Sequence, residues 1–237
     1  MEKIIVANMK MNLHFDEINN YLNEFKNYNT SGLVFCPPSI YLPYFLNSNY
    51  EVGIQNYAMY ENGAYTGEIS ASQVKSMNIN YAIIGHSERR EYFEETDNII
   101  NKKIKLGIEN NLKIILCIGE TLNHKENNQT NEILKKQIVE GLKDIKDINN
   151  IIIAYEPIWS IGTGLIPTND EIYDTTNFIK EEINRLYNKD IMVLYGGSVN
   201  DENINVLSEI NNLSGFLVGG ASLKPDKLKR IKETIIY

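Results

Sequence analysis

Residues 154–164 read A-Y-E-P-I-W-S-I-G-T-G and follow the apolar run Ile151-Ile152-Ile153. A short β-branched run of this kind predicts a strand buried on both faces, as in a parallel sheet, and places Glu156 at its carboxyl end. Pro157 has no N–H for the ladder and ends the strand. The following loop is long for a connection between a strand and a helix and carries Trp159, which we expect to be exposed. Long loops in compact domains are usually functional, although a plain connector is the simpler interpretation.

The rest of the chain repeats this pattern of an apolar run followed by an amphipathic stretch. The runs expected to form strands are Ile4–Ala7, Leu33–Cys36, Val52–Ile54, Tyr81–Ile84, Ile114–Ile118, Ile151–Ala154, Ile191–Leu194 and Phe216–Val218. The stretches expected to form helices are Asp16–Tyr28, Ile40–Asn47, Ser70–Met77, Thr96–Asn110, Thr130–Lys143, Glu171–Tyr187, Asp201–Ser208 and Pro225–Ile235. Strict alternation of strands and helices implies a parallel sheet. Eight such units without a linker-like break predict an α/β fold, a single closed (β/α)8 barrel with residues 1–237 as one domain. An open doubly wound sheet is the structural alternative.

Composition narrows the classes of protein that this chain can be. Its 237 residues are 43% hydrophobic and 23% charged, which is ordinary for a globular protein with a sizeable core. The formal net charge is −8 and no basic stripe interrupts it, so we expect no nucleic-acid partner. No apolar run is long enough to cross a bilayer and the N-terminus has no signal-peptide pattern, so we expect no membrane partner and a cytoplasmic location.

Several reactive residue types are expected to be structural. Cys36 and Cys117 each lie within an apolar run, which favours buried thiols in a reducing compartment over a disulfide. Arg89 and Arg90 are expected to form structural ion pairs. The sequence has no CxxC pair and no cluster of histidine and cysteine, so we expect no metal.

Polar residues gather just past the carboxyl ends of the predicted strands, which share the face of a barrel that carries active sites. In chain order they are Asn8, Lys10, Gln55, Asn56, Gly85-His86-Ser87-Glu88-Arg89-Arg90, Glu156, Tyr195-Gly196-Gly197-Ser198 and Gly219-Gly220-Ala221-Ser222. The glycine pairs after the last two strands allow backbone N–H groups to converge on a phosphate. A tight turn explains one pair equally well, but two pairs after consecutive strands favour phosphate binding.

The residues around His86 complete a plausible site for acid–base chemistry. His86 lies on the same rim as Glu156, and the following residues suggest a short helix whose first turn Ser87 caps. Because a helix N-terminus disfavours an imidazolium, we expect a neutral His86 that donates a hydrogen bond. We interpret Lys10 as a cation that faces an anionic substrate, with Glu88 as its partner, although most lysines are simply solvated. A carboxylate base, a neutral electrophile, a cation and a phosphate cradle together suit transfer of a proton next to a carbonyl group.

With these motifs the sequence resembles the triosephosphate isomerase family over essentially its whole length. The matching stretches are Asn8-Met9-Lys10-Met11-Asn12, Gly63-Ala64-Tyr65-Thr66-Gly67-Glu68, Gly85-His86-Ser87-Glu88-Arg89-Arg90, Cys117-Ile118-Gly119-Glu120, Ala154–Gly164, Tyr195-Gly196-Gly197-Ser198-Val199 and Gly219-Gly220-Ala221-Ser222-Leu223. The resemblance implies a cofactor-free isomerase of glycolysis and gluconeogenesis that interconverts dihydroxyacetone phosphate and D-glyceraldehyde 3-phosphate through an enediolate. This family is itself a standard example of tuned acid–base catalysis and of loop closure.

The resemblance also implies individual roles for the residues on the rim. It assigns catalytic roles to Glu156 as the base, His86 as the electrophile that polarises the carbonyl, and Lys10 as the source of positive charge. It assigns substrate binding to Asn8, to Lys10 and to the N–H groups of Gly162, Ser198, Gly219 and Gly220. It assigns supporting roles to Glu88, Ser87 and Tyr195, and matches Glu95 to a buried structural carboxylate. Finally, it implies a homodimer in which the loop Gly63–Glu68, with Thr66, reaches the second subunit.

A few positions depart from the family pattern without removing a catalytic group. Met9 replaces an aromatic residue, and Leu13 stands where glycine is common, near the implied subunit interface. Pro167 falls where the family uses a backbone N–H to bond the tyrosine at position 195, and proline has no N–H. A lyase would need a Schiff-base lysine or second acid, for which Lys10 is the sole candidate. The remaining alternative is a non-catalytic phosphate-binding or adhesion protein on a barrel scaffold.

Overall fold

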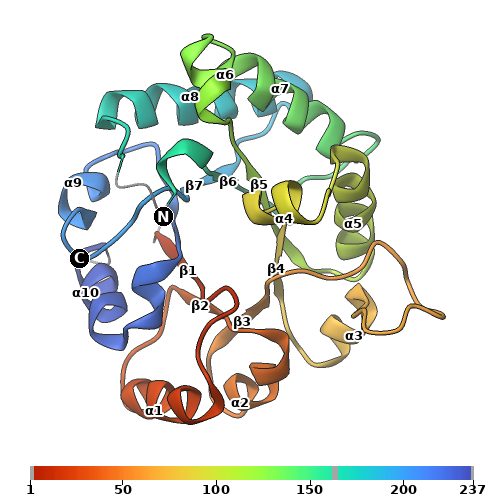
Figure 1. Ribbon diagram of the computed structural model, residues 1–237. Helices are drawn as coiled ribbons and strands as arrows, with labels where there is room; N and C mark the ends of the chain where they lie inside the picture. Colours follow the sequence, from red (N-terminus) through yellow and green to blue (C-terminus); the bar gives the residue numbers. More distant parts are fainter. Residues whose placement is uncertain (1–2, 162–164, 236–237) are drawn as a thin grey trace.

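The protein is a closed barrel of eight parallel strands surrounded by helices, as Figure 1 shows along the barrel axis. The computed structural model describes residues 3–161 and 165–235. The strands are β1 (Ile4–Asn8), β2 (Leu33–Cys36), β3 (Glu51–Ile54), β4 (Tyr81–Ile84), β5 (Lys113–Ile118), β6 (Ile151–Tyr155), β7 (Met192–Tyr195) and β8 (Gly215–Val218). Each strand pairs with its neighbours in sequence, and β1 closes the ring against β8, with Ile5 opposite Phe216. The predicted (β/α)8 barrel is confirmed, and the alternative of an open sheet is wrong.

Alternate residues along each strand belong to two separate apolar cores. Val6 lies inside the barrel with Cys36 and Cys117, whereas Ile5 and Ala7 pack outward against the helices. Both faces of each strand are therefore buried, which explains why the strands read as continuous apolar runs rather than as alternating ones. Both cysteines are buried free thiols, as predicted, and burial raises the pKa of each.

The longer helices pack around the outside of the barrel. They are α1 (Phe15–Phe25), α5 (Asp97–Glu109), α7 (Thr130–Gly141), α8 (Asn169–Tyr187) and α10 (Pro225–Ile235). Helix α8 begins two residues before the predicted Glu171, because Thr168 and Glu171 form a capping box. The Thr168 N–H donates to Glu171 Oε2 at 2.8 Å, and the Glu171 N–H donates to Thr168 Oγ1 at 3.2 Å. This cap fixes the end of the connection that follows β6.

Short helices account for most differences from the predicted elements. They are α2 (Leu42–Leu46), α3 (Ala71–Ser76), α4 (Ser87–Tyr92), α6 (Leu122–Glu126) and α9 (Ile204–Ser208), with 3-10 turns η1 (Ser39–Tyr41), η2 (Ile158–Ser160) and η3 (Gly220–Leu223). Helix α6 was not predicted. Helix α9 begins three residues later than expected, because the Asn200 side chain accepts from the N–H groups of Glu202 and Asn203 and holds that stretch as a turn.

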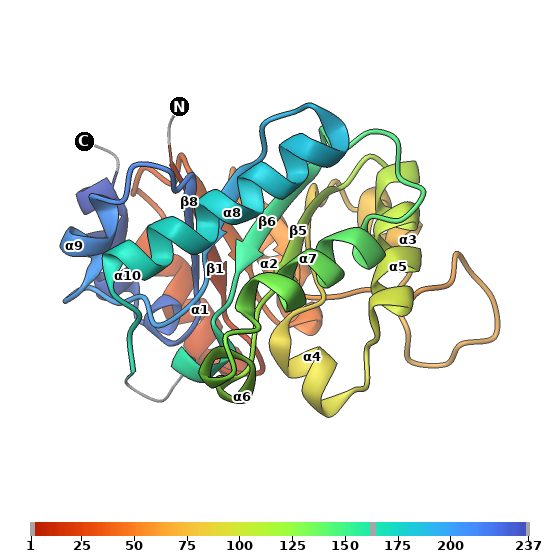
Figure 2. The ribbon, with the colours of Figure 1, turned by 90° about the horizontal axis from the view of Figure 1, so that it is seen from above.

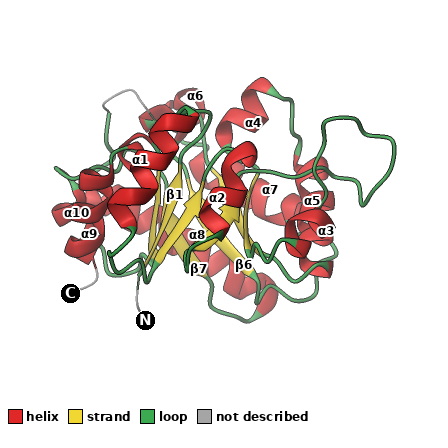
Figure 3. Cartoon of the chain, turned by 90° about the horizontal axis from the view of Figure 1, so that it is seen from below, coloured by secondary structure: helices red, strands yellow, loops and turns green. Residues whose placement is uncertain are grey.

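The segment between β3 and α3 projects from the barrel, as the side views show (Figure 2, Figure 3). Its base is tied by the Ala58 N–H, which donates to the Ile69 carbonyl at 2.8 Å. Its exposed rings Tyr60 and Tyr65 stack with centroids 3.9 Å apart. The segment includes the predicted intersubunit loop Gly63–Glu68. Among the described helices, none is both long and apolar enough to cross a membrane.

Candidate active site

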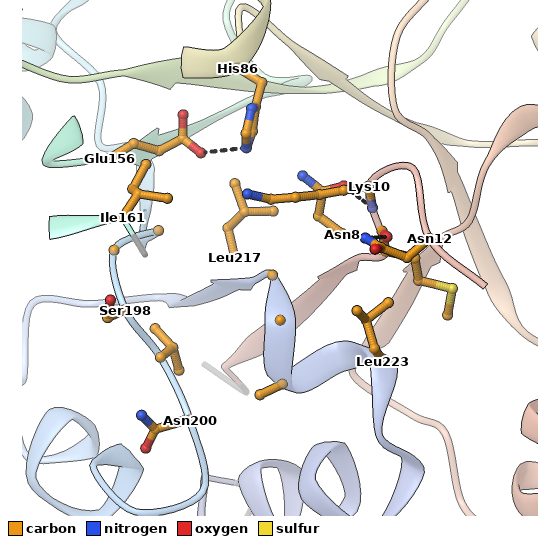
Figure 4. A pocket seen from close by; sticks show the side chains of 17 residues that line it. Asn8, Lys10, Asn12, His86, Glu156, Ile161, Ser198, Asn200, Leu217 and Leu223 are labelled. Atoms are coloured by element: carbon orange, nitrogen blue, oxygen red, sulfur yellow. Dashed lines mark hydrogen bonds and ion pairs between the residues drawn. The ribbon is translucent and has the colours of Figure 1, made fainter. Parts of the chain in front are cut away.

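The predicted rim residues gather around one cavity at the carboxyl ends of the strands (Figure 4). The cavity has a volume of about 510 Å³. Predicted site residues that line it are Asn8, Lys10, His86, Glu156, Ser198, Gly219 and Gly220. Gly162 lies outside the described residues. Ser87, Glu88 and Tyr195 stand behind the lining and contact it.

Glu156 is buried directly after β6, with 2% of its surface exposed. Its Oε1 lies 3.1 Å from His86 Nε2, and its Oε2 accepts the Ser87 N–H at 3.1 Å. The close passage of the chain past Gly119, where any side chain would collide with the Glu156 carbonyl, holds the backbone in place. Burial raises the pKa of Glu156, but the charge and hydrogen bond of His86, the Ser87 N–H and the Lys10 charge together lower it below its ordinary value. Glu156 is therefore an ionised carboxylate that can accept a proton.

His86 is the N-cap of α4, and its two ring nitrogens have different partners. Nδ1 accepts the Glu88 N–H at 3.3 Å, so the proton of the neutral ring is on Nε2, which faces Glu156. Burial lowers the pKa of His86, but the Glu156 carboxylate, by its charge and hydrogen bond, and the Glu88 charge raise it above its ordinary value. The helix N-terminus by itself favours a lower pKa, but the contact with Glu156 outweighs it. That His86 is neutral stays a prediction.

Ser87 does not cap the helix as the sequence suggested. The cap is His86, and Ser87 is the first residue of α4. Its contribution to the site is its backbone N–H, which points at the Glu156 carboxylate. A helix N-terminus thus meets an anionic side chain, which is the favourable arrangement for the helix dipole.

Lys10 extends across the cavity between β1 and α4 (Figure 4). Its Nζ lies 2.7 Å from Glu88 Oε1, which confirms the predicted ion pair. Its backbone is left-handed, with φ of 50°, a conformation that costs a non-glycine residue about 1–3 kcal/mol. Two side chains hold it there: Asn8 Oδ1 accepts the Lys10 N–H at 3.0 Å, and Gln55 Nε2 donates to the Lys10 carbonyl at 2.9 Å. Gln55 therefore shapes the site from behind, a role that its position after β3 did not reveal.

The second glycine pair, Gly219-Gly220, lies beside Lys10. A side chain at Gly219 would meet Lys10 Cε at 3.4 Å, and one at Gly220 would meet nothing within 4 Å. Gly197 has no such space, because a Cβ there would collide with the Tyr195 hydroxyl. Ser198 Oγ donates to the Ser160 carbonyl at 2.7 Å and so ties this loop to η2. The glycine loops thus expose backbone next to a cation, as a phosphate site requires.

Among the other residues that line the cavity, those within the stretches that carry the family resemblance are Met9, Asn12, Ile161, Gly196, Gly197, Val199, Ala221 and Leu223. Asn200 and Leu217 lie outside those stretches, and the sequence did not single them out. Leu217 belongs to the core inside the barrel and lies at the base of the cavity near Glu156 (Figure 4). The sequence could have predicted this position of Leu217, because alternate residues of a barrel strand point inward.

The sequence-based prediction is wrong for the exposure of Trp159 and is confirmed for the ion pairs of Arg89 and Arg90. Trp159 is partly buried rather than exposed, and its Nε1 donates to Glu120 Oε1 at 2.7 Å. Glu120 is 1% exposed, and burial raises its pKa despite this hydrogen bond. The predicted ion pairs are present, since Arg89 binds Glu95 and Arg90 binds Asp97.

Glu95 is buried, as predicted, and also contacts Lys103, which in turn donates to Asn56 Oδ1 at 2.7 Å. Within the described part of the chain, no group of three or more histidine, cysteine, aspartate or glutamate side chains is arranged to hold a metal ion.

Comparison with known proteins agrees with this geometry. The sequence model described as "Triosephosphate isomerase" matches residues 3–235. The triosephosphate isomerase of Thermodesulfovibrio yellowstonii is 44% identical, over 97% of this chain and 98% of its own length. That of Mesomycoplasma hyorhinis is 41% identical over 96% of each chain, and that of Clostridium tetani is 44% identical over 84% of this chain and 82% of its own.

Proposed function

Because this chain belongs to the triosephosphate isomerase family, we propose that it interconverts dihydroxyacetone phosphate and D-glyceraldehyde 3-phosphate by proton transfer through an enediolate. The observation that carries the proposal is the pair of Glu156 and His86, 3.1 Å apart in a cavity that Lys10 and the glycine loops also line. The reaction belongs to glycolysis and gluconeogenesis.

Glu156 is the base in this proposal. Its carboxylate removes a proton from the carbon next to the substrate carbonyl and returns it to the former carbonyl carbon, so the carboxylate is regenerated at the end of each turnover. The hydroxyl proton must also pass from one substrate oxygen to the other, and we assign this transfer to His86 Nε2. Burial with a lowered pKa keeps Glu156 ionised at neutral pH and ready to accept that proton. For this step the carboxylate must leave His86 and turn toward the substrate.

His86 and Lys10 stabilise the charge that develops on oxygen. The Glu88 N–H occupies His86 Nδ1, which leaves the Nε2–H free to donate to a substrate oxygen once Glu156 has turned away. The same movement removes the contact that raises the pKa of His86, so a neutral imidazole is favoured in the complex. The Lys10 ammonium, held by Glu88, adds positive charge near His86.

The phosphate group of the substrate lies in the glycine loops. We assign its binding to the N–H groups of Ser198, Gly219, Gly220 and Gly162, and assign Asn8 to substrate contact. Support comes from the open space at Gly220 and from the proximity of Gly219 to the Lys10 side chain. Tyr195 supports this end of the site through its position under Gly197.

We extend the proposal to a cytoplasmic homodimer formed through the loop Gly63–Glu68. The loop projects away from the barrel, and separate apolar side chains are exposed on the β1–α1 connection and nearby, including Met11 at 95% exposure. Phe15 and Tyr44 form an exposed aromatic pair with centroids 5.2 Å apart. Grouped aromatic and apolar side chains of this kind are typical of a surface that a partner covers.

A coupled dehydrogenase assay with either triose phosphate tests the proposal. We expect turnover in both directions without added cofactor or metal. A folded, dimeric preparation that shows no turnover would leave the alternative of a non-catalytic phosphate-binding protein. Titration then separates the two, because an isomerase site prefers 2-phosphoglycolate, whose planar carboxylate resembles the enediolate, over inorganic phosphate.

A further inference from the structure

Lys125 contacts both ends of the connection that joins β6 to α8. It lies in the short helix α6, which the sequence did not predict and which follows β5. Its Nζ lies 3.6 Å from the centroid of the Trp159 ring, at the start of the connection. The same Nζ donates to Glu171 Oε1 at 3.0 Å. One ammonium group therefore joins two segments that are far apart along the connection.

Each contact leads to a residue with a defined structural task. Glu171 forms the capping box with Thr168, so Lys125 is bound to the N-terminus of α8. Trp159 lies in η2, three residues after Glu156, and its Nε1 donates to Glu120. The position of the Trp159 ring therefore affects the backbone of η2, which follows Glu156 in the chain.

The buried carboxylate of Glu120 strengthens this link. Its Oε1 accepts from both Trp159 Nε1 and the Tyr155 hydroxyl, and its backbone carbonyl accepts the Ile158 N–H at 3.0 Å. The positive charge of Lys125 lowers the pKa of Glu120 against the larger opposing effect of burial. Lys125 thus contacts the face of the Trp159 ring and favours the ionised form of Glu120, whose carboxylate accepts the Trp159 N–H.

We propose that Lys125 is a positioning residue for catalysis, which acts through Trp159 and Glu171 to hold the two ends of the β6–α8 connection and thereby the backbone after Glu156. The proposal rests on the isomerase activity proposed above. Lys125 itself lies away from the residues that line the cavity, and its side chain is 33% exposed.

The test compares Lys125→Met with Lys125→Arg and with a matched lysine elsewhere. Methionine keeps most of the length but removes the charge, whereas arginine keeps both the contact with an aromatic face and the ion pair. The control is Lys135→Met, which removes a lysine 4.0 Å from Glu182 that joins α7 to α8 as Lys125 joins α6 to α8. Unfolding in urea is measured for each variant at the same time.

We expect Lys125→Met to lower kcat by about three- to tenfold with a much smaller change in KM, the range that loss of a cation–π contact corresponds to. Lys125→Arg restores kcat and Lys135→Met leaves it unchanged. Trp159 is the single tryptophan of the chain, so tryptophan emission comes from this ring alone. The emission spectrum changes in Lys125→Met and returns toward the parent in Lys125→Arg.

The proposal is overturned if Lys125→Met has the parent's kcat, if Lys135→Met loses as much, or if arginine restores the spectrum but not kcat. If the parent protein itself shows no turnover, the proposed function fails separately. Affinity for 2-phosphoglycolate, followed by Trp159 fluorescence, then decides the role of Lys125: equal affinity in parent and Lys125→Met overturns it.

Discussion

The charge states of Glu156 and His86 depend on each other, because the two side chains share a hydrogen bond in a site with little water. Burial alone would raise the pKa of the carboxyl and lower that of the imidazole. Their contact reverses both directions. Before substrate binds, Glu156 and His86 are therefore held together as a carboxylate and a proton donor.

Replacement of Glu156 by glutamine tests this dependence. Without the carboxylate the raising effect of its charge and hydrogen bond is lost, while burial still lowers the pKa of His86. We expect the pKa of His86 to fall below its value in the parent, as followed by NMR of the imidazole nitrogens through a pH titration. An unchanged pKa would mean that Glu156 does not set the charge of His86.

Lys10 faces an anion in this account, so its contribution to binding is sensitive to salt. We expect Lys10→Met to weaken both 2-phosphoglycolate binding and turnover, and added salt to weaken binding more in the parent than in the variant. Lys189→Met, which removes a lysine paired with Asp147 on the surface, serves as the control. Equal salt dependence in parent and Lys10→Met would show that Lys10 does not face the anion.

Positions on the rim could be predicted from single residues, but contacts between them could not. Glu156, His86 and Lys10 follow strands, and the barrel brings all strand ends to one face. The partner of each group depends on side-chain direction, which the sequence does not give. For this reason Ser87 was expected to cap a helix, although its N–H binds Glu156, and the support of Lys10 by Gln55 was missed.

At the level of elements, Pro167 stands before α8 at the position where the family pattern has an N–H for the tyrosine that ends β7. Among the described residues the Tyr195 hydroxyl is buried without a hydrogen-bond partner, although the Ser160 hydroxyl lies nearby. Burial raises the pKa of Tyr195 to about 12. The missing N–H of Pro167 agrees with a hydroxyl that has lost its usual partner.

We expect Tyr195→Phe to be nearly silent in the parent and costly once Pro167→Ala restores an N–H. The coupling in that double-mutant cycle corresponds to one net hydrogen bond, about 0.5–1.5 kcal/mol. Turnover and affinity for 2-phosphoglycolate are measured for the parent, for each single variant and for the double variant. A large effect of Tyr195→Phe in the parent would show that the hydroxyl has another partner, with the Ser160 hydroxyl the nearest candidate.

Most elements could be predicted from the sequence, and the short helix α6 is the exception. The strands read as continuous apolar runs and the longer helices bury a periodic apolar face, and both patterns are visible in the sequence. Helices α4 and α6 are too short to show a period. Helix α6 is capped locally, because Thr121 and His124 form a capping box. It is also tied to the rest of the barrel by contacts such as that of Lys125 with Glu171, which no local pattern encodes.

At the scale of the whole molecule, the closed ring of strands is what unites the site. Only closure brings β1, with Lys10 after it, beside β8 and its glycine loop. That residues 1–237 form one domain stays a prediction. The homodimer is a proposal that the shape of the projecting segment supports.

The dimer has a direct test in solution. Light scattering is expected to give about twice the chain mass of 27.2 kDa. Thr66→Arg places a charge in the exposed projecting loop and should shift the protein toward monomer with lower activity, because unpaired charge is costly in a covered surface. Asn131→Arg on an exposed position of α7 should leave the mass unchanged. A parent that scatters as a monomer would refute the proposed dimer.

The proposed catalysis depends on Glu156 as the group that moves the proton, and Glu156→Asp tests this most directly. The shorter side chain withdraws the carboxylate by roughly 1 Å, a misplacement that can cost about 100-fold in rate. In the coupled dehydrogenase assay we predict a loss of kcat of about that size, with affinity for the substrate largely retained. Parent-like turnover in Glu156→Asp would contradict the assignment of Glu156 as the base.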